Sequence, residues 1–98
     1  MQAALKEHAT RRGAAELAYV SCFSGAAVGV IDLRRQQMIQ KIVVGEKPLG
    51  VAMHPNGGRV YVCVGGANRV VVIETGTPSR ILRKIRMDGN PLQIAVAP

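Results

Sequence analysis

The chain has 98 residues, of which 48% are hydrophobic and 3% aromatic. This length allows one small unit, and the composition is that of a packed protein rather than of a disordered tail. The net charge of +7 favours anionic partners, while no apolar run is long enough to cross a membrane.

The N-terminal arm, residues 1–17, is rich in Ala, Glu, Lys and Arg. It predicts either a short helix that ends near Gly13 or an arm without regular structure. It contains no apolar core of the signal-peptide kind, so the sequence by itself predicts a soluble intracellular product.

From Ala18 onward, short β-branched segments alternate with turn residues, which predicts an all-β fold. The expected strands are, in chain order, Ala18–Cys22, Ala27–Leu33, Met38–Val44, Leu49–Met53, Arg59–Val64, Arg69–Glu74, Arg80–Met87 and Leu92–Ala97.

The same residues recur about 42 positions apart. Tyr19-Val20 returns as Tyr61-Val62, and Val28-Gly29-Val30-Ile31-Asp32 returns as Val70-Val71-Val72-Ile73-Glu74. Pro48-Leu49-Gly50-Val51-Ala52 returns as Pro91-Leu92-Gln93-Ile94-Ala95. Four strands per about 40–45 residues is the pattern of a β-propeller blade. The sequence therefore predicts two four-stranded antiparallel blades.

The two kinds of strand in each repeat predict different positions. Val70 to Ile73 is apolar on both faces, which is typical of a strand inside a sheet. The segment Arg80–Met87 and its counterpart Met38–Val44 are expected at the outer edges, because the cations of the former protect an exposed edge from pairing.

The segments Val28 to Pro48 and Pro48 to Val62 resemble the YVTN-type β-propeller repeat, in which a Pro-x-Gly-Val-Ala strand leads through Pro-Asn-Gly into a Tyr-Val strand. The resemblance covers roughly residues 18–98. It implies a propeller that is often exported and that serves as a surface-layer or binding protein or as part of a redox enzyme. The family's Asn after Tyr-Val-x is replaced by Cys22 and Val64.

The repeat divides the chain into the arm, residues 18–53 and residues 54–98. By this count the leading strand of the first blade should occupy Lys6 to Arg11, where no strand pattern exists, whereas Leu92–Ala97 is a spare strand at the other end. We expect self-association, with Leu92–Ala97 of one copy completing the first blade of another in a closed ring. The alternative is a fragment of a longer propeller.

Few residues suggest chemistry. Cys22 and Cys63 are out of phase in the repeat and are expected as free, buried thiols rather than as a disulfide. No metal-ligand spacing and no catalytic motif is present, so no catalytic residue, metal or cofactor is predicted. His54 is a weak cofactor candidate, because a loop histidine binds haem or metal in some redox propellers. Asp32 and Glu74 predict turn acceptors or, in an assembled ring, a circle of carboxylates.

The predicted function is a non-catalytic propeller module that acts as a structural or ligand- or protein-binding scaffold. The expected recognition loops lie at one face, and their residues are Phe23, Ser24, His54, Asn56, Asn68 and Arg69. The alternatives are a fragment of a cofactor-cradling redox enzyme and a basic nucleic-acid-binding module. The nucleic-acid alternative lacks a motif and aromatic stacking platforms.

Overall fold

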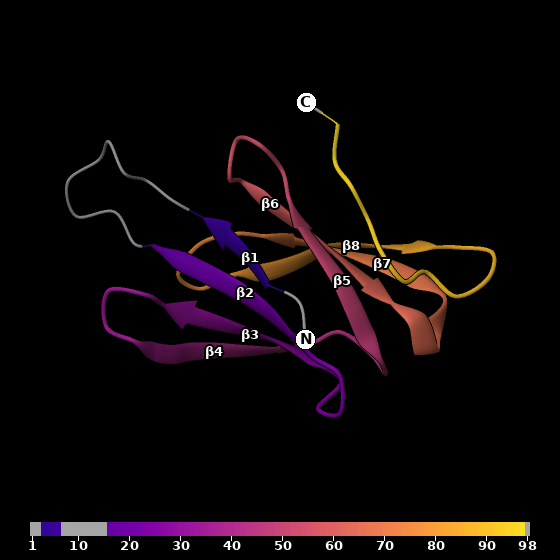
Figure 1. Ribbon diagram of the computed structural model, residues 1–98, viewed down its shortest axis with the longest axis horizontal. Coiled ribbons are helices and arrows are strands. Elements are labelled where there is room, and N and C mark those ends of the chain that lie inside the picture. The colour runs from indigo at the N-terminus through magenta and orange to yellow at the C-terminus, as the bar shows by residue number, and fades with distance from the viewer. Residues whose placement is uncertain (1–2, 7–15, 98) are drawn as a thin grey trace.

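The computed structural model describes residues 3–6 and 16–97 of the chain. Two four-stranded sheets follow one another, with strand orders β1-β2-β3-β4 and β5-β6-β7-β8, and each strand pairs antiparallel with the next (Figure 1). The strands are β1 (Ala3–Lys6), β2 (Leu17–Cys22), β3 (Ala27–Asp32), β4 (Gln37–Val43), β5 (Pro48–Met53), β6 (Arg59–Val64), β7 (Arg69–Glu74) and β8 (Arg80–Arg86). A 3₁₀ turn, η1 (Gly65–Ala67), follows β6.

The all-β prediction is confirmed, and the predicted ends of seven strands agree with the observed ones to within one residue or match them. β7 lies between β6 and β8, and its residues Val70 to Ile73 are buried. β4 and β8 lie at sheet edges and are largely exposed, as predicted from the cations of β8 and from the position of β4 as its counterpart in the repeat.

The short N-terminal helix is not seen, because Ala3–Lys6 forms strand β1 beside β2. The register makes β1 the counterpart of β5. Ala4 lies opposite Tyr19, as Ala52 lies opposite Tyr61. The expectation that the first sheet lacks its leading strand is therefore wrong. The expected position, Lys6 to Arg11, was too late because residues 7–16 connect β1 to β2, whereas residues 54–58 make the equivalent connection in the second sheet.

The predicted strand Leu92–Ala97 is not a strand in this chain, since residues 90–97 have no regular structure in the part that is described. Its first residue is nevertheless held against β5, where the Gly50 N–H donates to the Leu92 carbonyl at 3.0 Å. The place beside β2 that this segment was expected to fill in another copy is taken by β1.

The core lies between the two sheets and is formed mainly by aliphatic side chains. The first sheet contributes one face with Leu17, Tyr19, Val28, Val30 and Ile42. The second sheet contributes residues of opposite phase, namely Val51, Val60, Val62, Val64, Val71 and Ile73. This packing aligns the β3–β4 turn with the β7–β8 turn at one end of the molecule and gathers the connections described below at the other.

Candidate binding surfaces

Two of the predicted recognition loops lie at one end of the sheets and are joined by the linker between β4 and β5. The Ala26 carbonyl accepts from the N–H groups of Val44 and Gly45, at 3.0 and 3.2 Å. Farther along the linker, the Lys47 carbonyl accepts from the Gly65 N–H at 3.0 Å. Residues 23–26 and 65–68 are thus fastened to one strip of backbone. We call this end the linker end.

The linker end presents four of the predicted binding residues, Phe23, Ser24, Asn68 and Arg69, all exposed. Phe23 is 52% exposed. Asn68 has a left-handed backbone (φ 52°) that Asn tolerates better than most residues. A fixed backbone with an exposed phenyl ring is suited to binding another protein or an apolar ligand.

His54 and Asn56 lie at the opposite end, in the β5–β6 turn, so the structure does not bring the six predicted binding residues together. The His54 Nδ1 accepts from the Asn56 N–H at 3.2 Å, and the Asn56 Oδ1 accepts from the Gly58 N–H at 2.7 Å. Both side chains therefore stabilise their own turn. A bond from His54 to a cofactor would have to come from Nε2.

The matching acids Asp32 and Glu74 have different partners. Asp32 Oδ1 accepts from the N–H groups of Arg34 and Arg35, at 3.0 and 3.2 Å, which confirms the turn-acceptor interpretation for this residue. Glu74 Oε1 instead accepts from the Arg80 Nε at 2.9 Å, in an exposed ion pair. Such pairs contribute at most about 1 kcal/mol.

An open cleft of about 920 Å³ lies where the β3–β4 and β7–β8 turns meet, at the end opposite the linker end. Its lining residues are Asp32, Arg34, Arg35, Ile39, Gln40, Thr77 and Pro78. Sequence reasoning missed this cleft, because its two walls come from turns of different sheets and neither wall carries a motif. Its most strongly charged wall already holds the Asp32–Arg35 contact at 3.8 Å.

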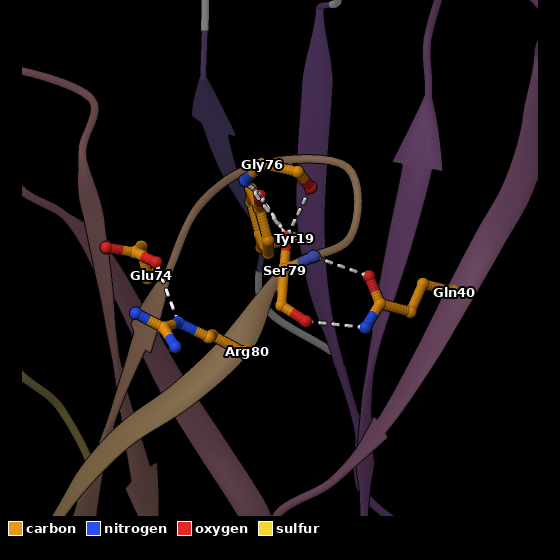
Figure 2. A network of polar contacts seen from close by, with 6 residues as sticks. All are labelled: Tyr19, Gln40, Glu74, Gly76, Ser79 and Arg80. Atoms are coloured by element: carbon orange, nitrogen blue, oxygen red, sulfur yellow. Dashed lines mark hydrogen bonds and ion pairs between the residues drawn. The ribbon is translucent and has the colours of Figure 1, made fainter.

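Beside this cleft, a buried polar network joins the two sheets (Figure 2). The Tyr19 hydroxyl is 2.7 Å from Ser79 Oγ and accepts from the Gly76 N–H at 3.3 Å. Ser79 Oγ donates to the Gly76 carbonyl at 2.7 Å, so the Tyr19 hydroxyl is the donor to Ser79. Gln40 pairs with the Ser79 backbone twice, at 2.6 and 2.8 Å. Burial raises the pKa of Tyr19, and the hydrogen bonds with Ser79 and Gly76 offset part of this rise.

The outer face of the second sheet carries a groove of about 490 Å³. Its lining residues are Arg59, Tyr61, Val72, Leu82, Arg83 and Ile85. Tyr61 occupies here the position that Tyr19 occupies in the first sheet, since both lie at the same register of the second strand. One tyrosine is fully buried under a neighbouring sheet, whereas the other borders an open groove.

The two cysteines are not joined in a disulfide. Both are free thiols; Cys63 is buried and Cys22 partly buried. Burial raises the pKa of the Cys63 thiol, which makes this side chain a poorer nucleophile. Within the described residues, no group of three or more His, Cys, Asp or Glu side chains could hold a metal ion. The described part of the chain likewise has no helix with the length and apolarity needed to span a membrane.

Comparison with known proteins supports the arrangement of the strands. No protein-family model and no curated protein matches the sequence. Among solved structures the chain is similar to Kuenenia stuttgartiensis hydrazine synthase, with a TM-score of 0.78 and 21% sequence identity. The similarity covers 94% of this chain but 24% of that one. The chain therefore spans about a quarter of its structural neighbour, and at this identity the likeness concerns the arrangement of strands.

Proposed function

We propose that the chain is a non-catalytic β-propeller repeat module of the YVTN type, which acts as a scaffold and recognises a protein or small ligand through the linker end. Each sheet is then one blade. Four antiparallel strands in sequential order, repeated at a constant spacing, are the pattern of such blades.

The observation that carries this proposal is the way in which each repeat leads into the next. The Leu49 carbonyl at the start of the second repeat accepts from the Ser21 hydroxyl of the first sheet at 2.8 Å. Leu92, the equivalent residue one repeat later, has its carbonyl bonded to the Gly50 N–H of the second sheet. Both leucines thus follow an edge strand and contact the preceding sheet, Leu49 at β2 and Leu92 at β5, which supports a stack of successive blades.

The contacts of three candidate side chains support a scaffold. Among the described residues, His54 and Asp32 accept hydrogen bonds within their own turns, and Cys63 is buried. The linker end, in contrast, has exposed side chains on a backbone that hydrogen bonds between segments hold in place.

The competing function, a cofactor-cradling redox fragment, is tested by haem titration. Purified protein is titrated with haemin and the Soret band is followed for the wild type and for His54→Ala. For a scaffold we expect a colourless protein and the same weak, non-saturating absorbance change for both chains. Saturable haem binding at one equivalent that His54→Ala abolishes would overturn the scaffold proposal. Phe23→Ser serves as a matched loop control, because it alters the opposite end of the sheets.

A further inference from the structure

The outer face of the second sheet is equivalent, in the repeat, to the face of the first sheet that is buried in the core. Val30 pairs with Gln40 in the first sheet as Val72 pairs with Arg83 in the second, and Val28 pairs with Ile42 as Val70 pairs with Ile85. With Tyr19 and Tyr61, these pairs define equivalent faces. In the first sheet that face is buried by its neighbour. In the second sheet Ile85 is 42% exposed and Tyr61 borders the groove.

The outer face of the first sheet, where Ala18 and Gly29 are buried and Val20 and Ile31 are partly buried, is equivalent to the surface that buries Tyr19. The second sheet covers Tyr19 with the face that contains Val60, Val62, Val71 and Ile73. The repeat places Ala18, Val20, Gly29 and Ile31 at these positions of the first sheet. That face also carries Met38 and Val43, which are 61% and 68% exposed. Met38 lies over Gly29, because a Cβ at Gly29 would be 3.2 Å from the Met38 sulfur.

We propose that a second copy of this chain covers the Tyr61 face with the outer face of its first sheet. The contact is head-to-tail, since the two surfaces differ, and it repeats between copies the sheet packing seen within one copy. The inference rests on the proposed function, in which each sheet is one blade of a β-propeller repeat module. A second copy is the partner we choose because each copy carries both surfaces of the contact, as heterologous association requires.

The inner contact indicates how the outer one is made. Within one copy, Gln40 Nε2 donates to the Ser79 carbonyl at 2.6 Å. Gln37 and Arg80 begin their strands at the same register, so the two repeats can be aligned from them. In the contact between copies, Arg83 therefore occupies the position of Gln40. Gln36 of the second copy occupies the position of Ser79. Arg83 can still donate to a backbone carbonyl, but it cannot accept a hydrogen bond as Gln40 does. The intermolecular contact is therefore weaker than the internal one.

Charge weakens it further. Arg59 and Arg83 replace Leu17 and Gln40 on the equivalent face, and each copy carries a net charge of +7. The β3–β4 turn of the incoming copy, which would approach Tyr61, contains Arg34 and Arg35. Like charges brought together in this contact repel each other more at low ionic strength than at 0.1 M salt, where the screening length is about 10 Å. Added salt should therefore strengthen the association, in contrast to binding of an acidic partner.

The test is sedimentation velocity at 10–200 µM protein in about 20 mM and about 300 mM NaCl. The wild type should sediment faster as its concentration rises, and more so at the higher salt. Ile85→Glu blocks the second-sheet face and Val43→Glu the first-sheet face, so each variant alone should be monomeric. An equimolar mixture should form a one-to-one dimer, because Val43→Glu retains an intact second-sheet face and Ile85→Glu an intact first-sheet face.

Asn90→Glu adds the same charge in an exposed position between β8 and the C-terminal segment and should associate like the wild type. Circular dichroism and urea midpoints verify that all variants are folded. A wild type that stays monomeric at 200 µM in both salts overturns the proposal, as does a mixture of folded variants that remains monomeric. Neither result changes the outcome of the haem titration, so the scaffold proposal is tested independently of self-association. If the wild type is monomeric, the partner of the Tyr61 face must be sought among other proteins.

Discussion

The Tyr19–Ser79 contact should contribute a measurable part of the stability of this small protein. Tyr19→Phe removes a hydroxyl that donates to Ser79 Oγ at 2.7 Å and accepts from the Gly76 N–H at 3.3 Å. Tyr61→Phe is the matched control, because it removes the same atom from the equivalent position in the second sheet, beside an open groove.

The size of the effect follows from what remains after the hydroxyl is removed. Ser79 Oγ still donates to the Gly76 carbonyl at 2.7 Å, and the Gly76 N–H still donates to Ser79 Oγ at 3.2 Å. Because neither partner loses its last hydrogen bond, the cost should be that of one net bond, about 1 kcal/mol. A buried group left wholly unpaired would cost up to about 3 kcal/mol. Ser79→Ala removes three contacts at once and should cost about 2 kcal/mol.

The assay is urea unfolding of dilute protein at low salt, where self-association does not contribute. With a slope near 1 kcal/mol per M, Tyr19→Phe should lower the midpoint by about 1 M and Tyr61→Phe by less than about 0.3 M. The corresponding shift in Tm for Tyr19→Phe is about 4–8 °C. Equal destabilisation by the two variants, or an unchanged midpoint for Tyr19→Phe, would refute the account of the buried network.

Two further predictions concern the C-terminal segment and pH. Gly50→Ala should release residues 91–97 and raise their amide exchange at least about tenfold, because a Cβ at Gly50 would lie 2.6 Å from the Leu92 carbonyl oxygen and 2.8 Å from the Gln93 Cα. Gly25→Ala is the control, because a Cβ at Gly25 would have its nearest atom at 3.7 Å. Unchanged exchange in Gly50→Ala would contradict the contact. Burial raises the pKa of Tyr19, so its hydroxyl holds its proton more tightly in the folded state, and the resulting stability is complete below about pH 10 and lost as pH rises further. The urea midpoint of the wild type should therefore fall more steeply above about pH 10 than that of Tyr19→Phe, and parallel curves would contradict it.

The strands were predictable where the signal is local. Arg59–Val64 and Arg69–Glu74 were predicted with their observed ends, since each is an apolar run bounded by Gly, Asn or Thr-Gly. β1 was missed because Ala-Ala-Leu-Lys favours a helix by intrinsic propensity, whereas its pairing with β2 decides its conformation. The reverse error occurred at Leu92–Ala97, whose sequence predicts a strand but which has no regular structure in the described part of the chain, although Leu92 contacts β5.

The candidate site was less predictable, because it depends on contacts between residues distant in sequence. His54 and Asn68 both precede or follow strands in glycine-rich turns, and a sequence does not show that these turns lie at opposite ends of a sheet until the strand order is known. Similarly, nothing near Tyr19 indicates Ser79, which is 60 residues away. The sequence did contain one indication, because the tyrosine recurs at the same position of both repeats and this favours a structural role for that position.

Within a repeat protein, the positions where the copies agree report the fold, and those where they differ report what each copy does. Tyr19 and Tyr61 agree, as do Val30 and Val72, and all four belong to the packing face. On that same face Leu17 becomes Arg59 and Gln40 becomes Arg83, so the second sheet exchanges an apolar and a neutral side chain for two cations. A face built for permanent burial gains nothing from these charges, because each must be desolvated or paired. A contact that forms and dissociates as the salt concentration changes tolerates these two charges. The face with Arg59 and Arg83 should therefore determine whether copies of the chain associate, more than the tyrosines that the two repeats share.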